Sequence, residues 1–241
     1  MLTFFRKIRK SIVQAGSARK YLLYAVGEIA LVVIGILIAL QINTWSENRK
    51  LEIKEINLLE ELQINLETNV INLQNDVTHQ IYQAEKLNDV IAHLEDKRAY
   101  NDSLSLFLDV GMPAPDVTLT SSAFETLKST GLELIRSNSL RTSIINLFEV
   151  SYPYLMQETK RLEDQMWPSV VLPLQQKHFK HMPDAPFIPT DYAGLLQDQE
   201  FINMLSFRLT MRTSSTNLKE SAIQLTMEVI SSIDRELSIR K

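Results

Sequence analysis

The stretch YLLYAVGEIALVVIGILIALQI, residues 21–42, decides the architecture of this chain. It holds one acid, Glu28, and one amide, Gln41, among apolar or small residues, and it has no proline. A helix rises about 1.5 Å per residue, so about 20 residues cross the roughly 30 Å hydrocarbon core of a membrane. Only a helix satisfies its own backbone hydrogen bonds in lipid. The stretch predicts a transmembrane helix over residues 21–45, held in a lipid bilayer.

Aromatic residues stand at both ends of this stretch, with Tyr21 and Tyr24 at the start and Trp45 after it. Such residues are typical anchors at the membrane interface. A cleaved signal peptide and a buried core helix are the alternatives. A signal h-region spans only about 7–15 residues and ends in a small-x-small site, which residues 39–42 do not offer. A buried helix of this length is rarely apolar on every face. The retained span is the interpretation that the sequence favours.

The first 20 residues carry six basic side chains and no acidic one. These topology determinants are Arg6, Lys7, Arg9, Lys10, Arg19 and Lys20. Lys and Arg beside a span stay on the cytoplasmic side. Three basic residues that follow the span, Arg49, Lys50 and Lys54, weaken this difference without reversing it. We expect residues 1–20 to be a basic cytoplasmic tail, with the C-terminal domain across the membrane.

One face of the predicted span combines an acid with small residues. Glu28, Val32, Gly35 and Ala39 share this face at about 100° per residue. Gly35 and Ala39 form a small-xxx-small pair, which allows two helices to approach closely. An acid in lipid is costly, so Glu28 would face a protein partner, either a second copy or another membrane protein. If the hydrocarbon segment instead runs over residues 29–45, Glu28 lies at headgroup level and needs no partner.

Residues 46–98 predict one long amphipathic helix that continues the span. Apolar residues recur at spacings of three and four, as in a coiled coil. They are Ile56, Leu59, Leu62, Leu66, Val70, Leu73, Val77, Ile81, Ala84, Leu87, Ile91 and Leu94. Five asparagines weaken helix propensity along the same segment. They are Asn57, Asn65, Asn69, Asn72 and Asn75. One helix of an intramolecular bundle is therefore favoured over a regular parallel coiled coil.

Residues 99–241 predict the remainder of a helical bundle, so the fold class is all-α. Residues 101–103 can cap a short helix, Ser121 or Ser122 a helix that Gly131 closes, and residues 137–138 another. Pro153 should kink or split that third helix. Residues 167–190 contain five prolines and are the most linker-like region. Helical spacing returns over residues 199–239.

No constellation of residues predicts an enzyme, a cofactor or a metal. His178 and His181, with Asp184 near, could share a metal, but zinc sites usually have three or four ligands, and solvated loop histidines are the favoured interpretation. His79 and His93 are expected at the surface. The sequence has no cysteine and none of the common catalytic or phosphate-binding motifs. The acidic domain disfavours nucleic acid.

Several segments resemble one family. They are residues 4–9 (FFRKIR), 20–29 (KYLLYAVGEI), 32–43 (VVIGILIALQIN) and 45–50 (WSENRK), and a looser likeness covers residues 124–131. The family consists of uncharacterised bacterial membrane proteins described only as a domain of unknown function. The resemblance implies a single-span protein of the bacterial envelope. Together with the basic tail, this predicts a single-pass protein of the bacterial inner membrane with a cytoplasmic N-terminus and a periplasmic C-terminal domain. It supplies no catalytic residue, but it includes Glu28, which favours a role of this residue in assembly.

We expect a membrane-anchored envelope protein that is a non-enzymatic interaction or assembly module. The alternative is an extracytoplasmic domain that senses a ligand or stress and signals through a membrane partner, because residues 1–20 are too few to fold as an output domain. A pocket lined by mixed side chains would favour the sensor, and an exposed apolar patch would favour assembly. A membrane-tethered hydrolase would need a convergent His, acid and Ser cluster.

Overall fold

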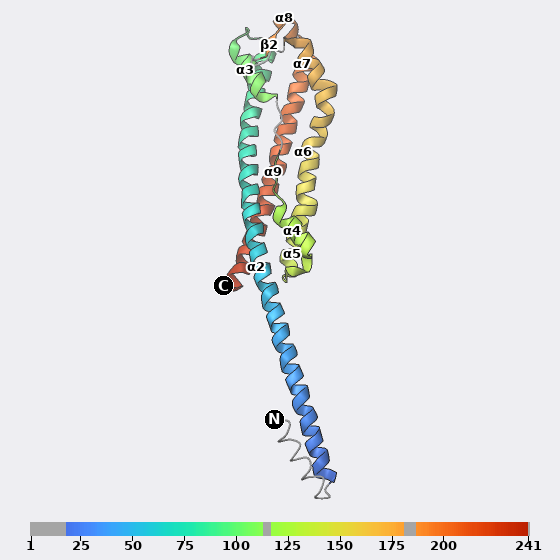
Figure 1. Ribbon diagram of the computed structural model, residues 1–241. Coiled ribbons are helices and arrows are strands. Elements are labelled where there is room, and N and C mark those ends of the chain that lie inside the picture. Colours follow the sequence, from blue (N-terminus) through green and yellow to red (C-terminus); the bar gives the residue numbers. More distant parts are fainter. Residues whose placement is uncertain (1–17, 113–116, 181–186, 241) are drawn as a thin grey trace. The chain divides into compact units, whose positions relative to one another are not determined.

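The computed structural model describes residues 18–112, 117–180 and 187–240. The chain consists of two compact units, Met1–Glu55 and Ile56–Lys241. Helix α2 (Ala18–Glu95) is continuous and contributes to both units (Figure 1). The prediction of an all-α chain, in which the apolar helix continues into a long second helix, is confirmed.

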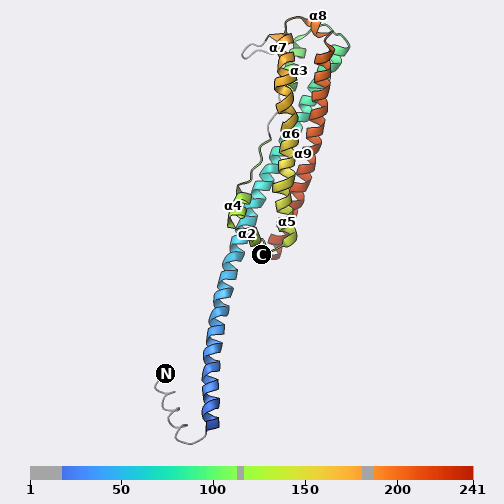
Figure 2. The ribbon, with the colours of Figure 1, turned by 90° about the vertical axis from the view of Figure 1, so that its right-hand side faces the viewer.

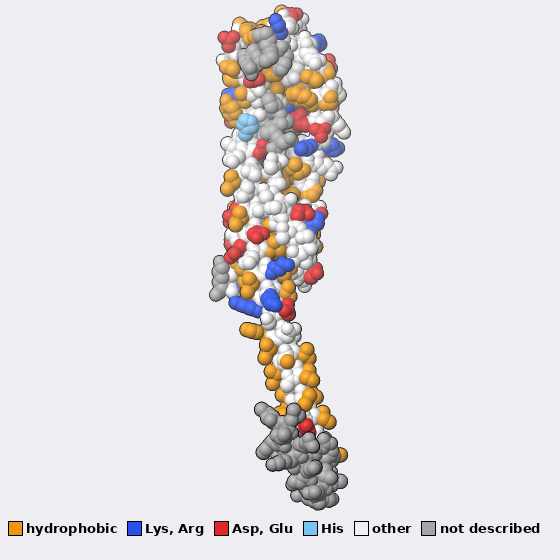
Figure 3. All heavy atoms as spheres, viewed as in Figure 1, with side chains coloured by type: hydrophobic (Ala, Val, Ile, Leu, Met, Phe, Trp, Pro, Cys, Tyr) orange, Lys and Arg blue, Asp and Glu red, His pale blue; other side chains and the backbone are white. Residues whose placement is uncertain are grey.

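The first unit presents its apolar side chains on the surface. An 18-residue window of α2 near its N-terminus reaches a mean hydropathy of 2.5, and none of that window is buried. Hydrophobic side chains cover this part of α2 in the space-filling view (Figure 3). By length and composition the helix could cross a membrane, and a signal sequence would have the same features. A core helix would be buried, so that alternative is excluded.

The second unit is built from the end of α2 and a series of further helices. In its described residues, two short strands, β1 (Phe179–Lys180) and β2 (Ile188–Pro189), pair antiparallel. Its helices after α2 are α3 (Asp102–Gly111), α4 (Ser122–Thr130), the 3-10 turn η1 (Leu132–Leu134), α5 (Asn138–Asn146), the π-helix η2 (Leu147–Ser151), α6 (Tyr152–Met166), the π-helix η3 (Trp167–Val171), α7 (Leu172–His178), α8 (Tyr192–Leu195) and α9 (Gln199–Arg240).

Three long rods lie side by side in this unit: the end of α2, the run from α5 to α7, and α9 (Figures 1 and 2). The first two run in the same direction, and α9 runs antiparallel to both. The chain must therefore return between α2 and α5, and α3 and α4 lie at opposite ends of this return (Figure 1). A parallel neighbour reached by a long return is consistent with helix-packing rules for bundles with a crossover connection.

Prolines in the second rod coincide with π turns instead of breaks. Pro153 follows η2, which supports the predicted disturbance at this residue. Pro168 lies inside η3, where the Leu172 N–H bonds to the Trp167 carbonyl five residues back. A π turn of this kind lets the helical path continue past a residue that lacks an N–H donor. The prediction that residues 167–190 form a linker is therefore wrong for residues 167–178, which are helical.

Apolar side chains form two main clusters at the two ends of the bundle. One contains Leu62 and Leu66 of α2, Phe124 of α4 and Phe148 of η2. The rings of Phe124 and Phe148 stack at 4.5 Å between centroids. The predicted helix that Gly131 closes packs into this cluster, since Phe124 is only 2% exposed. Gly131 ends that helix at a φ of 116°, a conformation that favours glycine.

Asparagines of α2 hold the returning segment before α4. Asn69 is fully buried, and its amide pairs with both backbone groups of Thr120: Oδ1 accepts from the N–H at 2.6 Å, and Nδ2 donates to the carbonyl at 2.9 Å. Asn72 donates to the Thr118 carbonyl at 3.2 Å. Asn65 accepts from the Ala123 N–H at 3.1 Å and so caps the start of α4 from a different helix. Residues that weaken the helix locally thus connect it to its neighbours.

Candidate functional site: a pocket beside a buried polar layer

The face predicted for helix association is exposed along α2. Glu28, Val32, Gly35 and Ala39 are all solvent-exposed, and a Cβ built on Gly35 would meet nothing within 4 Å. Of the predicted interface anchors, Trp45 is 71% exposed and Tyr24 is half-buried. The face is therefore accessible to a partner.

The predicted basic topology determinants and Tyr21 lie at the N-terminal end of the chain, before and at the start of the apolar stretch. Arg6, Lys7, Arg9 and Lys10 lie outside the described residues. Arg19, Lys20 and Tyr21 belong to α2, and the structure describes their backbone alone.

Two histidines were expected in solvent and are buried instead. His178 ends α7, is 6% exposed, and places Nε2 2.7 Å from Asp198 Oδ2. His93 is 8% exposed and lies 3.1 Å from the Tyr192 hydroxyl, which in turn donates to the Arg98 carbonyl. Both predictions were wrong because tertiary packing covers these positions. His79 is exposed, as expected, and His181 and Asp184 lie outside the described residues.

Within the described ranges, no group of three or more His, Asp or Glu side chains is placed to hold a metal ion. His178 lies against the ring of Phe201, with 5.4 Å between centroids. Its contacts are those of a side chain that joins α7 to the start of α9, which is a structural role.

Asp198 is the centre of that junction. Its Oδ2 accepts from Lys177 Nζ at 2.6 Å, and its Oδ1 accepts from the backbone N–H groups of Glu200 and Phe201 at 3.0 and 3.2 Å. The hydrogen bond from Lys177 is the main reason why the pKa of Asp198 is far below its usual range, with a smaller contribution from His178. The carboxylate thus caps α9 while it pairs with α7.

This low pKa predicts that acid weakens the bundle. A carboxylate with a lowered folded-state pKa contributes stability that is present above the ordinary aspartate pKa of about 3.9 and is lost as the pH falls further. We expect Asp198→Asn to be less stable than wild type at pH 7 and to lose less stability between pH 5 and pH 2. Urea unfolding at each pH measures this. Asp109→Asn, an exposed site on α3, is the control and should follow the wild-type curve; identical slopes for all three proteins would contradict the prediction.

A buried polar layer crosses the bundle between the two apolar clusters. On α9, Arg208, Arg212 and Lys219 are 1%, 4% and 0% exposed. They are four and seven residues apart, so they lie on one face of the helix. On the facing side of α2, Gln80 and Gln83 are 5% and 2% exposed. These two glutamines interrupt the series of regularly spaced apolar residues predicted for α2, which we call the apolar stripe.

The stripe prediction was wrong at this layer. Ile81, which was expected in the core, is 45% exposed, whereas its neighbour Gln80 is buried. Polar groups at core positions are stable only when they are hydrogen-bonded. The partners of Gln83 and Gln80 are Arg212 and Thr216 of α9, which the spacing of α2 cannot reveal.

Both arginines bind the C-terminal end of α3. Arg212 donates from Nη2 to the Gly111 carbonyl and from Nη1 to Gln83 Oε1, each at 2.6 Å. Arg208 donates to the Met112 carbonyl and pairs with Glu163 Oε2 of α6 at 2.8 Å. The last carbonyls of a helix carry partial negative charge, so cations there satisfy acceptors and the helix dipole together.

Close packing brings α3 to this layer. A Cβ on Gly111 would lie 2.9 Å from Leu87 Cγ, so only glycine allows α3 to approach α2 this closely.

Burial changes the acid–base properties of the layer. Burial, helped by the nearby charge of Arg208, lowers the pKa of Arg212 to about 10. Burial also lowers the pKa of Lys219, and the ion pair with Asp76 opposes this decrease. The layer therefore holds its cations at an energetic cost, which several hydrogen bonds offset.

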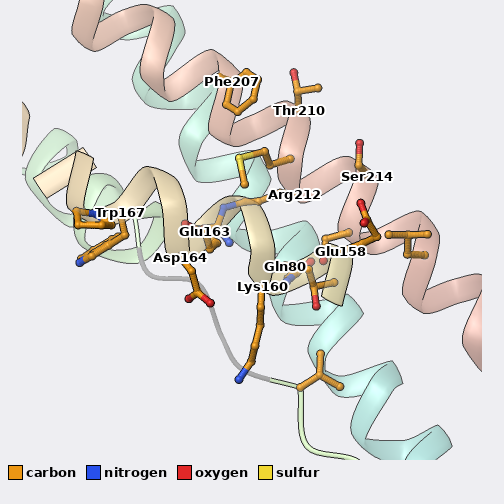
Figure 4. Close-up of a pocket in the computed structure, with 16 residues that line it drawn as sticks. Gln80, Glu158, Lys160, Glu163, Asp164, Trp167, Phe207, Thr210, Arg212 and Ser214 are labelled. Atoms are coloured by element: carbon orange, nitrogen blue, oxygen red, sulfur yellow. The ribbon is translucent and has the colours of Figure 1, made fainter. Parts of the chain in front are cut away.

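A pocket of 710 Å³ opens beside this layer, between α6 and α9. Figure 4 shows Glu163 next to Arg212 between these helices, with Trp167 and Phe207 on the two walls. Its volume lies within the range of about 300–1,000 Å³ typical of ligand sites. Acids, hydroxyl groups, aromatic rings and aliphatic side chains all contribute to the lining. By the criterion set from the sequence, a pocket with such a mixed lining favours ligand binding.

The chain matches the model of one protein family, the "Family of unknown function (DUF6090)", over residues 28–211. No curated protein matches the chain, and no solved structure does. The family match covers more than half of the sequence, including most of α2, the whole return to α5 and the pocket walls up to Met211.

Proposed function

This chain belongs to the DUF6090 family of unknown function, and we propose that it is a membrane-anchored helical bundle that binds a small molecule in the pocket between α6 and α9. The pocket is the observation that carries the proposal. A membrane-anchored domain that binds a small molecule has the properties of a sensor. It would signal that the ligand is bound through a partner protein in the membrane. No catalytic step is assigned to the site.

The membrane anchor is supported by the apolar and exposed N-terminal part of α2. Burying such side chains in lipid removes them from water, at about 25 cal/mol for each Å² of apolar surface. The excess of basic residues before the span supports a cytoplasmic N-terminus and a periplasmic bundle in the bacterial inner membrane.

Anchoring and orientation are tested together. We expect the full chain to stay in the membrane pellet after a carbonate wash, and a C-terminal reporter that is active only in the periplasm to give signal. Recovery of the intact chain in the soluble fraction would exclude the anchor. A signal from a cytoplasmic-type reporter at the same position would reverse the orientation.

Ligand binding of any chemical class is tested by a mixed fragment library against the purified full chain. We expect some fragments to raise its melting temperature. Ser214→Trp, which places a large ring at a pocket-lining position of α9, should abolish these increases. Ser221→Trp, on an exposed part of the same helix outside the pocket, should leave them unchanged. If no fragment discriminates between the two variants, the proposed function is wrong.

A second candidate, assembly through the span, is supported by the exposed Glu28 face. Ala39 belongs to this face, and Ala30, nine residues earlier, lies about 180° around the helix. We expect Ala39→Leu to reduce crosslinked oligomer in membranes by blocking close helix approach, and Ala30→Leu to leave it unchanged. Equal crosslinking of the two variants would remove this candidate.

A further inference from the structure

The pocket's charged groups differ in how firmly they are held. Glu163 pairs with the buried Arg208 at 2.8 Å, so its charge is already used by the polar layer. Glu158, five residues earlier on α6, pairs at 3.0 Å with Arg161, whose side chain is 50% exposed. An exposed pair three residues apart on a helix contributes at most about 1 kcal/mol. Glu158 is therefore the inner carboxylate that a ligand cation can take over at low cost.

The two cations of the lining do not favour a ligand anion. Arg212 holds Gln83 and the end of α3, and a ligand would have to displace those bonds. Lys160 extends from α6 away from α9, on the same side as Asp164 (Figure 4). Neither cation therefore presents a free charge to the space between α6 and α9.

Aromatic rings line the same space. Trp167 and Phe207 are 37% and 46% exposed, and they come from η3 and α9. The face of an aromatic ring attracts cations. Trp167 already has the Arg208 guanidinium 5.8 Å from its ring. A ligand with a positive charge and an apolar body can use both the rings and the carboxylate.

Gln80 provides a polar group that is nearly buried and lines the pocket. It is 5% exposed, and its Oε1 accepts a hydrogen bond from the Thr216 hydroxyl at 3.4 Å. Buried polar groups are normally paired. Because the oxygen and nitrogen of an amide can exchange places, Gln80 can turn its oxygen to accept from a ligand N–H.

The net negative charge of the bundle also favours a cationic ligand. From residue 56 onward the chain has 25 acidic and 16 basic residues. Such an excess raises the local concentration of cations and disfavours anions.

We infer that the pocket takes an organic ammonium ion with an aromatic or apolar body, held by Glu158, Gln80 and the rings of Trp167 and Phe207. This inference rests on the proposed function, because it names the ligand class of that pocket. The ammonium group replaces Arg161 at the Glu158 carboxylate, and the body of the ligand lies between the two rings.

The test uses three probes that share one scaffold and differ in charge: 2-phenylethylammonium, 2-phenylethanol and phenylacetate. Titration calorimetry on the full chain in detergent measures each affinity. We expect the cation to bind about tenfold more tightly than the alcohol, as for a charge-assisted hydrogen bond in a partly desolvated site. Phenylacetate should bind most weakly. Alcohol binding equal to that of the cation, or preferential binding of phenylacetate, would overturn the inference.

Matched variants locate the charge. Glu158→Gln should lower the affinity for 2-phenylethylammonium about fivefold and leave that for 2-phenylethanol unchanged. Glu149→Gln removes a paired acid outside the pocket, whose side chain is 46% exposed against 27% for Glu158, and it should change neither affinity. Equal effects of both variants would overturn the role of Glu158. Failure of all three probes, with fragments of other classes still blocked by Ser214→Trp, would end the ammonium assignment and preserve the proposed function.

Discussion

Replacing Asp76 by asparagine is expected to lower the free energy of unfolding of the bundle by about 3–5 kcal/mol, because it leaves the Lys219 ammonium buried without its counter-charge. The two side chains form an ion pair between α2 and α9 and are only 11% and 1% exposed. Burial already lowers the pKa of Lys219, and Asp76 is the group that raises it again. Urea unfolding of the full chain in detergent, followed by circular dichroism, measures the loss.

The control is the same substitution in an exposed pair of the same helix. Lys86 and Asp89 lie 3.1 Å apart, and the Asp89 side chain is 48% exposed. Asp89→Asn should therefore cost less than about 1 kcal/mol. The double variant Asp76→Leu with Lys219→Met should recover most of the stability, since apolar residues can replace a buried ion pair. Equal losses for Asp76→Asn and Asp89→Asn would contradict the burial of the first pair.

The helical fold could be predicted because it depends on features that are local in the sequence. The long apolar run and the three- and four-residue spacings require only neighbouring residues to be recognised, and Leu59, Leu62, Leu66 and Leu73 are indeed fully buried. Gly131 was recognised for the same reason, since its role follows from the helix that it ends.

The polar layer could not be predicted because each member finds its partner on a distant part of the chain. Gln83 and Arg212 bond across 129 positions of sequence. From the sequence alone, Arg212 and Lys219 would be expected on an exposed face of their helix, because charged residues are rarely fully buried unless they are paired. The interruption of the apolar stripe at Gln80 and Gln83 was the available signal, but without α9 it indicates no particular partner.

The candidate site depends on this layer in turn. Arg212 and Gln80 line the pocket, and Glu163 lines it while it binds Arg208. The pocket therefore forms where polar side chains replace the larger apolar contacts of the two end clusters. The position of the pocket depends on how α2, α6 and α9 pack against one another. The helices could be predicted from the sequence, but their relative positions could not.

Asn69 is the second position where a single substitution should have a large effect. Asn69→Leu keeps a similar volume but leaves the Thr120 N–H and carbonyl without their partner, and each unsatisfied buried group costs about 1–3 kcal/mol. The Asn69 amide also lies 3.4 Å from the Tyr152 hydroxyl, which is 2.9 Å from Thr226 Oγ1. Loss of the amide thus affects α2, α6, α9 and the segment before α4. We expect a decrease of about 2–4 kcal/mol in urea unfolding.

Asn75→Leu, at an exposed position of the same helix, controls for the change in helix propensity. It should alter the free energy of unfolding by less than about 0.5 kcal/mol. Hydrogen exchange gives an independent readout, because the Thr120 amide should exchange faster in Asn69→Leu and at the wild-type rate in Asn75→Leu. A Thr120 amide that stays equally protected in both variants would show that Asn69 does not hold the returning segment. The core at the α4 end would then depend on apolar packing alone.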